Sequence, residues 1–496
     1  MADVEDSWDN ASERVGRAGG SWDAMTHDEE ELDATGRPYR EVSYWLEDVP
    51  HLRARPRLEG VHEADVAILG GGYTGLWTAY YLTELEPSLR VAILEAEIAG
   101  YGASGRNGGW CNSSMLGVSP EELARRVGAE GARAMFMALR ETVDEVGQVC
   151  QREGIDVAWR KAGVIRAAVG RHELPLLQQR WAAQERLGLT DGCTLLGEVE
   201  LKRRVRIASA RGALHDSHVA FHHPARLVRG LAEVVESRGV TIFEQSPVVD
   251  YRLGRSPRLE TRDGEVRART VVFAGEAYMT RLRRWRRRML PVYSLVVLSE
   301  PLTDAQWEQV GWENGECLSS HSLSVDYSSR THDGRILFGG RGARYRFGSK
   351  VAAELDHDPG IHESLRERVR RWFPPLEDVK FTHAWGGPLG VTRDWMPTFE
   401  YDPRLGFATV HGYAGQGVAP SNLAGRLMAN AITDRVDSPL FELPLASHRA
   451  RSWEPEPVRW LGVRFVQRGL AAADRRAERS GRPPTGRSLP ERLARH

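Results

Sequence analysis

Hydrophobic residues along the chain fall into short runs typical of buried strands, and these runs alternate with helical periodicity. The first clear run, at 66–69, has the four consecutive apolar residues expected of a strand inside a parallel sheet. A glycine-rich turn at 70–75, a helical segment at 76–82 and a second apolar run at 90–95 follow it. This order predicts a βαβ unit in which glycines form the turn between the first strand and the helix.

The same alternation continues through most of the chain. Further helical patterns are expected at 119–152, 173–188, 223–238, 362–372 and 421–433. Further strand-like runs are expected at 163–169, 240–243, 266–275, 292–298, 335–339 and 409–412. Between 290 and 382 strands follow one another with a single helix. We therefore predict an α/β fold with a Rossmann-like nucleotide-binding domain and a second domain built on an antiparallel sheet.

These patterns divide the chain into four expected parts. An N-terminal arm over 1–60 carries charges, Gly and Pro around a short apolar cluster at Tyr44, Trp45 and Leu46. A Pro- and Arg-rich extension ends the chain, and its last segment, 480–496, is expected to be disordered. The expected ranges are 61–160, 217–285 and 384–436 for the nucleotide-binding domain, 161–216 and 286–383 for the second domain, and 437–496 for the extension.

Composition narrows the possible functions. With 496 residues the chain is long enough for two domains and a large cofactor. The 67 Lys and Arg residues balance 68 Asp and Glu residues, so no overall field attracts nucleic acid or an anionic membrane. The four cysteines have no metal-binding spacing and are too few for a disulfide scaffold, which favours a reducing, cytoplasmic setting without a metal site. The acidic N-terminus does not resemble a signal peptide.

The segment 281–288, RLRRWRRR, mixes basic residues with Trp285 in the way that some nucleic-acid-binding segments do. A charged connection between the strand that ends near Gly275 and the sheet that begins near Pro291 explains the same residues more simply. We expect such a connection and no nucleic-acid partner.

The glycine turn has the spacing of a dinucleotide-binding motif. Gly70 permits the tight turn, Gly72 lets the backbone approach a pyrophosphate, and Gly75 lets the helix pack closely on the strand. The helix N-terminus then faces the phosphates. Glu95 ends the second strand, where a carboxylate can accept hydrogen bonds from ribose hydroxyls. Strand, helix and acid together predict that the chain binds a dinucleotide.

Two further glycine-rich loops are expected near this cofactor. The loop 102–110, GASGRNGGW, follows Glu95 and should lie on the cofactor side of the sheet, where backbone N–H groups could wrap a ligand. A flexible surface loop is the alternative for this segment taken alone. The loop 412–418, GYAGQGV, follows a strand-like run and precedes a helix.

Together the three motifs resemble those of the D-amino-acid oxidase-like family of FAD-dependent oxidoreductases. Within that family, the SGRNGG and GYAGQGV segments are most similar to the branch that contains gamma-glutamylputrescine oxidoreductase. The resemblance covers about 40–440. It implies a bound FAD, a flavin domain assembled from separate segments, and a substrate sheet that covers the flavin ring.

The resemblance also implies which residues hold the FAD. Residues at 70–75 and Glu95 would bind the ADP half, the loop 102–110 would follow the pyrophosphate and the ring, and the loop 412–418 would border the pyrimidine edge. Val248 is expected beside the adenine. The full expected set is Gly70, Gly72, Tyr73, Thr74, Gly75, Glu95, Ala103, Ser104, Arg106, Asn107, Gly108, Gly109, Val248, Ala274, Gly275, Gly412, Gly415, Gln416, Gly417 and Val418.

Three positions depart from the family pattern. Asp326 lies near the place of the cysteine that holds flavin covalently in monomeric sarcosine oxidases, and Arg106 stands where dimethylglycine dehydrogenases use a histidine. Neither side chain can form that bond, so we expect FAD to be bound non-covalently. Ala419 occupies the place of a lysine that clamps the substrate carboxylate in sarcosine-type enzymes. We therefore expect a substrate that is larger than a small N-methyl amino acid or is anchored differently.

Side chains of the second domain are expected to contact the substrate. For Tyr293 and Trp385, packing in the core is the alternative. For His321, which lies among serines, an ordinary surface histidine is the simpler alternative. Arg330 could anchor a carboxylate by a bidentate contact, although a solvated face is the default in an arginine-rich chain. The candidate catalytic residues are Tyr293, His321, Tyr327, Arg330 and Trp385.

The activity that the resemblance implies is oxidation of a carbon–nitrogen bond in a small amine or amino acid. FAD supplies the difficult chemistry, and the imine product is hydrolysed to an aldehyde or keto compound. O2 is the expected acceptor and would give H2O2. The alternatives are a flavin dehydrogenase, or a non-catalytic FAD-binding subunit, that uses another acceptor. An NAD-dependent dehydrogenase would need the first motif but not the two later loops. The oligomeric state is left open.

Overall fold

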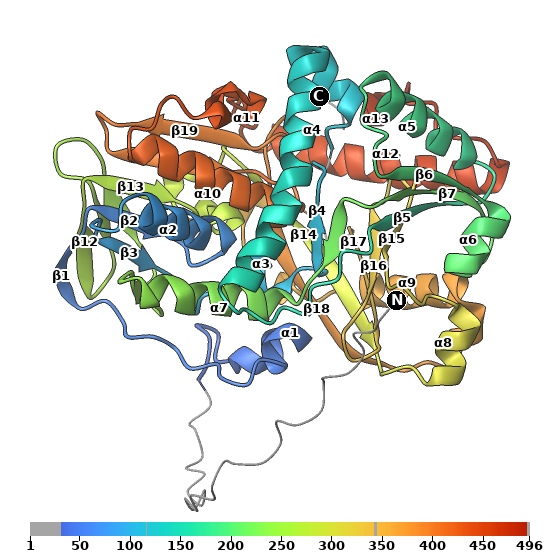
Figure 1. Ribbon diagram of the computed structural model, residues 1–496, viewed down its shortest axis with the longest axis horizontal. Coiled ribbons are helices and arrows are strands. Elements are labelled where there is room, and N and C mark those ends of the chain that lie inside the picture. The colour runs from blue at the N-terminus through green and yellow to red at the C-terminus, as the bar shows by residue number, and fades with distance from the viewer. Residues whose placement is uncertain (1–30, 116, 342–344, 494–496) are drawn as a thin grey trace, which may run out of the picture.

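The computed structural model describes residues 31–115, 117–341 and 345–493, and its two largest sheets lie side by side (Figure 1). The six-stranded sheet has the order β19-β20-β13-β2-β3-β9 and is parallel except for β19. Its strands are β2 (Val66–Leu69), β3 (Val91–Leu94), β9 (Thr241–Phe243), β13 (Thr270–Phe273), β19 (Thr398–Asp402) and β20 (Phe407–His411). The predicted βαβ unit is confirmed, because β2 and β3 pair in parallel and α2 (Tyr73–Leu85) connects them.

Alternate residues of these strands face two different cores. Val66 and Ile68 pack against the helical side, whereas Ala67 packs on the opposite side. The helical side is formed by α2, which contacts α7 (Pro224–Ser237) on one flank and α10 (Val418–Ile432) on the other. Because the strands are buried on both faces, they carry the continuous apolar runs that made them recognisable in the sequence.

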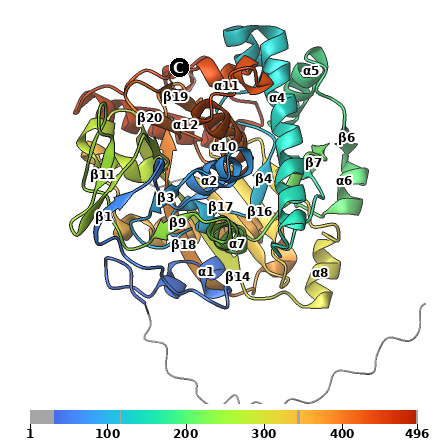
Figure 2. The ribbon, with the colours of Figure 1, turned by 60° about the vertical axis from the view of Figure 1, so that its left-hand side comes forward.

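A four-stranded sheet covers the opposite face (Figure 2). It has the order β1-β12-β11-β10, with strands β1 (Gly60–Glu63), β10 (Asp250–Arg252), β11 (Arg258–Glu260) and β12 (Gly264–Arg267). The prediction of one strand over 266–275 is therefore wrong, since this segment contributes to β12 and then to β13 in different sheets. The chain crosses between the sheets at the exposed residues Arg267 and Arg269.

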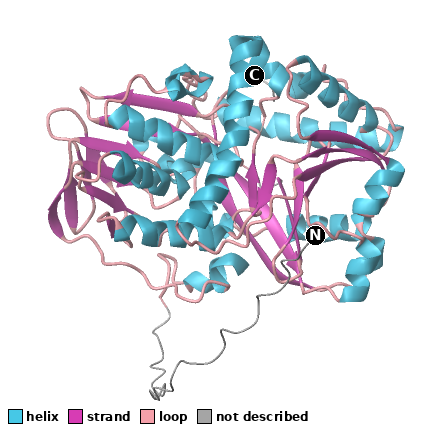
Figure 3. Cartoon of the chain, in the orientation of Figure 1, coloured by secondary structure: helices cyan, strands magenta, loops and turns pink. Residues whose placement is uncertain are grey.

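The eight-stranded sheet has the order β18-β14-β17-β16-β15-β5-β7-β6 and is antiparallel except where β15 pairs with β5. Figure 3 draws the strands of both large sheets in magenta. Its strands are β5 (Val164–Val169), β6 (Cys193–Gly197), β7 (Ala210–Asp216), β14 (Leu290–Ser299), β15 (Cys317–Ser320), β16 (Asp326–Arg330), β17 (Ile336–Arg341) and β18 (Phe381–Val391). The expected domain boundary at 384 falls inside β18. A short antiparallel pair, β4 (Trp110–Asn112) and β8 (Val219–Phe221), completes the strands.

One face of the eight-stranded sheet packs against helices. Ile165, Leu295 and Phe338 share a core with α9 (Pro359–Trp372). The helix α8 (Asp304–Val310) contributes Val310 to the same core. Next to β5 and β7 lies α5 (Leu174–Arg186), whereas α6 (Glu198–Arg204) packs on β6 and β7. On the other face, Val164, Leu298 and Leu337 pack against the N-terminal arm around Trp45, and the rest of that face is available to form a site.

Both ends of the described chain pack on this framework. Tyr44, Trp45 and Leu46 are buried in α1 (Tyr44–Glu47), so the expected apolar cluster of the arm is part of the core. The extension forms α11 (Pro444–Ser447), α12 (Val458–Ser480) and α13 (Leu489–Leu493). Disorder was expected from 480 onward, but α13 packs against α12.

The longest described helix, α4 (Pro120–Arg152), begins after the N-cap residue Ser119 and is interrupted at Gly128, whose φ is 83°. It crosses the centre of the molecule between the two large sheets in Figure 1. Within the described ranges, no helix combines the length and the apolar character needed to span a membrane.

The arginine-rich segment 281–288 connects the two large sheets. Trp285 is 2% exposed, and its ring lies 5.1 Å from that of Phe273 on β13. The guanidinium of Arg288 pairs with Glu400 on β19. The aromatic residue of the segment therefore belongs to the core, as a connection between sheets requires.

Gly75 should tolerate no side chain. A Cβ at this position would lie 2.1 Å from the carbonyl oxygen of Gly70, so helix and strand would have to separate. We expect Gly75→Ala to lower the free energy of unfolding by about 1–3 kcal/mol and to reduce FAD content. Gly462→Ala in α12 is the matched control, because nothing lies within 4 Å of its Cβ position. Equal urea-unfolding curves for the two variants would contradict this packing.

Candidate active site

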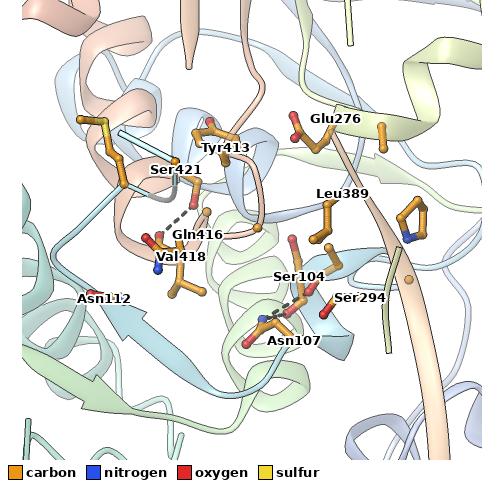
Figure 4. A pocket seen from close by; sticks show the side chains of 18 of the residues that line it. Ser104, Asn107, Asn112, Glu276, Ser294, Leu389, Tyr413, Gln416, Val418 and Ser421 are labelled. Atoms are coloured by element: carbon orange, nitrogen blue, oxygen red, sulfur yellow. Dashed lines mark hydrogen bonds between the residues drawn. The ribbon is translucent and has the colours of Figure 1, made fainter. Parts of the chain in front are cut away.

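A cavity of about 820 Å³ is lined by residues from both large sheets. Its volume lies in the range of roughly 300–1,000 Å³ typical of sites for small molecules and cofactors. Figure 4 shows Ser104, Asn107, Gln416 and Leu389 around this space. These residues come from the loop 102–110, the loop 412–418 and strand β18, so the cavity brings together segments that are far apart in the sequence.

The glycine turn forms one end of the cavity. Gly70 has a φ of 109°, and a Cβ there would lie 2.9 Å from the carbonyl oxygen of Ala274. Gly72 precedes α2 and lines the cavity. The backbone N–H of Tyr73 donates to Ser104 Oγ at 2.9 Å, so the loop 102–110 approaches the N-terminus of α2. A helix N-terminus open to a cavity is suited to bind a phosphate.

Glu95 lies where the second strand ends. Its carboxylate accepts backbone hydrogen bonds from Gly71 at 2.7 Å and from Glu97 at 3.1 Å. Burial raises the pKa of this carboxyl to about 7. The carboxylate lines the cavity and could accept hydrogen bonds from hydroxyl groups of a ligand.

The loop 102–110 is fixed by its own asparagine. Asn107 Nδ2 donates to the carbonyl oxygen of Ser104 at 3.0 Å, and Asn107 Oδ1 accepts from the Gly109 N–H at 2.8 Å. Gly108 leaves room for the ring of Tyr327, which would lie 2.4 Å from a Cβ at that position. The alternative of a flexible surface loop does not fit these contacts.

Arg106 is 3% exposed and is held by two residues that the sequence analysis did not identify. Its Nη1 lies 2.7 Å from Asp356 Oδ2, and its Nη2 donates to the hydroxyl of Tyr278 at 2.6 Å. Burial alone would lower the pKa of the guanidinium, but Tyr278 and Asp356 raise it. The Nε atom of Arg106 has no described partner and so remains able to donate to a ligand.

Glu276 is the most prominent cavity residue missed by sequence reasoning (Figure 4). Its Oε1 accepts from the Gly390 N–H at 3.2 Å and its Oε2 from the Gly412 N–H at 2.9 Å. Burial raises the pKa of this carboxyl to about 7, against the effect of its backbone hydrogen bonds. The residue has a φ of 46°, which is uncommon for a non-glycine residue. The only sequence signal was an acid directly after Ala274 and Gly275.

The loop 412–418 closes the cavity from the side of α10. Gly412 and Gly415 have φ values of 87° and 95°, which explains the glycines. Tyr413 shares a hydrogen bond of 2.9 Å with Thr74 in α2, so the first and third motifs are in contact. Ser114 Oγ donates to Gln416 Oε1 at 3.2 Å.

Most of the expected site residues line this one cavity. The residues that do so are Gly70, Gly72, Tyr73, Thr74, Glu95, Ala103, Ser104, Arg106, Asn107, Gly108, Val248, Ala274, Gly275, Gly415, Gln416, Gly417, Val418, His321 and Tyr327. The residues placed outside its lining are Gly75, Gly109, Gly412, Tyr293, Arg330 and Trp385. For the glycines this agrees with roles in packing and turn geometry.

The three outlying candidates for catalysis have other partners. The Tyr293 hydroxyl donates to the Ala352 carbonyl at 3.2 Å, in the core behind the sheet. Arg330 donates to the Trp312 carbonyl at 2.9 Å and lies over the ring of Trp307. The Trp385 indole donates to the Arg106 carbonyl at 2.9 Å, so it supports the loop 102–110 from behind.

Two groups of metal-ligand-type side chains occur within the described residues, one at Asp48, His223 and His332 and the other at Cys193, Asp216 and His218. In each group an arginine already contacts a member. Arg226 lies 2.8 Å from Asp48 Oδ2, and Arg140 lies 3.6 Å from Cys193 Sγ. In both groups the positive charge is thus supplied by an arginine side chain. None of these residues lines the cavity.

The fold, the three glycine loops and the shared cavity define a nucleotide-binding oxidoreductase. A family model described as FAD dependent oxidoreductase, DAO, matches residues 65–431. The chain therefore belongs to the DAO family of FAD-dependent oxidoreductases. The predicted family is confirmed.

Relatives and solved structures agree with this assignment. The chain is 32% identical over 385 residues to "Probable oxidoreductase OrdL" of Haemophilus influenzae, covering 76% of this chain and 84% of that protein. It is 30% identical over 382 residues to gamma-glutamylputrescine oxidoreductase of Escherichia coli, covering 76% and 85%. Glycine oxidase from Geobacillus kaustophilus has the same fold, with a TM-score of 0.63 and 23% identity over 78% of this chain and 100% of that chain. The predicted fold class is confirmed.

Glu276 should give the stability of the protein without FAD a definite pH dependence. The pKa of this carboxyl is raised from 4.5 to about 7 by burial, so the folded chain holds the proton more tightly than the unfolded chain. Its contribution to stability is complete below about pH 4.5 and is lost as the pH rises through about 7. A Glu276→Gln variant has no such loss. We expect the difference in unfolding free energy, variant minus wild type, to increase from about pH 5 to about pH 8.

Urea unfolding of the apoprotein at several pH values measures this difference. Each pKa unit corresponds to about 1.4 kcal/mol, so the increase cannot exceed about 3 kcal/mol, and contact with cavity water will make it smaller. Glu300→Gln is the control, because Glu300 accepts a backbone hydrogen bond from Lys380 outside the cavity. A difference for Glu276→Gln that stays constant with pH would contradict the assignment.

Proposed function

We propose that this chain oxidises a carbon–nitrogen bond of an amine-bearing metabolite larger than glycine or sarcosine, with FAD bound non-covalently. The observation that carries the proposal is a cavity lined on one side by the glycine turn 70–75 of the six-stranded sheet and on the other by residues of the eight-stranded sheet. A flavin held by the first surface would present its ring to a substrate held by the second. An amine substrate is inferred from the similarity of the chain, over most of its length, to gamma-glutamylputrescine oxidoreductase.

The residues present fit FAD. The N-terminus of α2 and the backbone near Gly72 suit the pyrophosphate, and Glu95 suits the ribose hydroxyls. Buried polar atoms of Arg106 and Asn112, both of which line the cavity, have no partner among the described residues. Since buried polar groups are normally hydrogen-bonded, these atoms support a polar ligand in the cavity.

When bound, FAD supplies the acceptor for a hydride from the carbon next to the amine nitrogen. The chain's own residues orient the substrate and exclude water. Val296, Leu389 and Met115 provide apolar walls, which favour the uncharged amine. The positive N-terminal end of α10 faces the same cavity through Gly417 and Val418, and would stabilise negative charge that develops there.

The substrate size follows from the absence of a lysine at position 419. Ala419 is fully buried in α10 and does not line the cavity, whereas its neighbours Gln416 and Val418 do. A small amino acid has little surface other than its carboxylate with which to bind. We therefore propose a conjugated polyamine, an ω-amino acid or an aminophosphonate as substrate, and O2 as the electron acceptor.

Acid or heat denaturation should release all of the FAD. Among the described residues no cysteine lines the cavity, and His321 is the one histidine that does. Yellow colour that stays with the precipitated polypeptide would contradict non-covalent binding. In that case His321→Asn would show whether this imidazole forms the bond, since release would then be restored.

Anaerobic mixing with candidate substrates should bleach the visible absorbance of the flavin only for larger amines. The panel is gamma-glutamylputrescine, 4-aminobutanoate, 2-aminoethylphosphonate, glycine and sarcosine, with a 2-hydroxy acid as a control without nitrogen. Efficient bleaching by glycine or sarcosine alone would contradict the proposed size. Bleaching by none of the amines would favour a non-catalytic FAD-binding subunit. Admitting O2 and measuring H2O2 then separates an oxidase from a dehydrogenase.

A further inference from the structure

Two arginines, one buried and one partly exposed, line the cavity near β5, which is five places from β18 in the order of the eight-stranded sheet. Arg166 lies in β5 and is 7% exposed. Its neighbours Ile165 and Ala167 belong to the core behind the sheet, so the alternation of the strand turns Arg166 toward the cavity. Arg180 reaches the same cavity from α5, which packs on β5 and β7.

Neither guanidinium forms an ion pair with a carboxylate of the described residues, although the charge of Asp216 favours the protonated form of both. No carboxylate lies within 4.0 Å of Arg166 or Arg180 among residues 31–115, 117–341 and 345–493, and Arg180 Nε is a buried donor without a partner. His321, which also lines the cavity, has a buried Nε2 without a partner. Burial and the charge of Arg166 lower the pKa of Arg180 to about 9. A buried, unpaired charge of this kind is costly, so its presence indicates a ligand of opposite charge.

The nearby acids are already held by other donors. Asp216 on β7 accepts from the ring and the backbone N–H of His218, at 2.9 and 3.0 Å. Asp326 pairs with Arg368 at 2.7 Å. Glu173 accepts backbone hydrogen bonds from Val169 and His321. None of these acids is in ion-pair contact with Arg166 or Arg180, so both guanidinium groups keep donors that can bind an anion.

The C-terminal extension forms part of the wall at this end of the cavity. Asp474 in α12 accepts hydrogen bonds from the backbone N–H groups of Leu323 and Ser324, at 3.1 and 2.8 Å, and so holds the loop that carries His321. Leu470 in α12 and Glu491 in α13 are themselves part of the cavity lining. An ion pair formed behind this wall would be stronger than one at the surface.

We propose that Arg166 and Arg180, with His321, bind an oxyanion of the substrate at a distance from the amine that is oxidised. This inference rests on the proposed function. Tyr327 on β16 contacts the loop 102–110, where the flavin would lie, and β5 is two strands further along the sheet. Two strand spacings are about 10 Å. The substrate class is therefore an amine that carries a carboxylate or a phosphonate several bonds away, bound by the bidentate contacts that guanidinium groups favour.

Calorimetric titration of the FAD-loaded protein with amine-free anions tests the site without turnover. Butanoate and propylphosphonate are the probes, and butanamide is the neutral control. We expect at least one of the two anions to bind and butanamide not to bind. Arg166→Gln and Arg180→Gln should each weaken that binding by about tenfold or more, and Arg166→Lys should weaken it less. Arg211→Gln is the matched control, because Arg211 is exposed on β7 and does not line the cavity.

The outcomes separate this inference from the proposed function. FAD content reports whether each variant folds, and the partly exposed Arg180 gives a second variant if Arg166→Gln does not. Binding of butanoate alone identifies a carboxylate site, and binding of propylphosphonate alone a phosphonate site. The inference is overturned if the wild type binds neither anion, or if both Gln variants bind the anion with the affinity of the wild type. Anion binding without bleaching by any amine would refute the proposed function and leave the oxyanion site intact.

Discussion

Three consecutive carbonyl groups of the loop 102–110 are held by side chains from three different elements. The Trp385 indole donates to the Arg106 carbonyl at 2.9 Å, the Trp45 indole to the Asn107 carbonyl at 2.8 Å, and the Ser329 hydroxyl to the Gly108 carbonyl at 2.7 Å. Because a trans peptide directs its N–H opposite its C=O, these contacts turn N–H groups of the loop away from the anchors. The two sheets, the N-terminal arm and the cavity wall meet at these three bonds.

The same constraint explains why the N-terminal arm is part of the folded structure. Trp45 is fully buried, and it shares a core with Trp385 and with residues of both β5 and β14. Removal of this indole would leave a cavity as well as an unsatisfied carbonyl behind the loop. The arm therefore acts on the candidate site through the backbone of the loop 102–110, although its described residues, 31–60, do not line the cavity.

Buried charge is distributed unevenly around the cavity. On the side of the glycine motifs, Glu95 and Glu276 have a raised pKa because of burial, and backbone N–H groups hold their carboxylates. On the side of β5, Arg166 and Arg180 have no such partners. The fold itself supplies hydrogen-bond donors to the two carboxylates, whereas the two guanidinium groups need a ligand as their acceptor. This contrast supports two different binding tasks at opposite ends of one site.

The sequence by itself determined the βαβ unit, the glycine loops and the family. Gly70, Gly72 and Gly75 are specified by local geometry, since a tight turn and close helix packing need no information from distant residues. The buried parallel strands are equally local, because burial on both faces leaves an uninterrupted apolar run. Most expected cofactor residues accordingly line the cavity. The prediction of one strand over 266–275 was wrong because the chain passes from one sheet to another within this segment and keeps its apolar pattern on both sides of the crossing.

Only the tertiary structure decided which polar residues face the cavity. Glu276 and Asp356 lie in segments without any motif, and they reach the site because β13, β18 and the loop 102–110 converge there. Arg166 is one of many arginines, and its importance comes from the strand alternation and from the lack of a carboxylate in ion-pair contact with it among the described residues. Tyr293 was expected at the substrate but lies in the core behind the sheet. Trp385 lies on the same face as Val296, where its indole is covered by the loop 102–110. The face of a strand and the partners of a side chain depend on contacts between distant segments, which no local pattern contains.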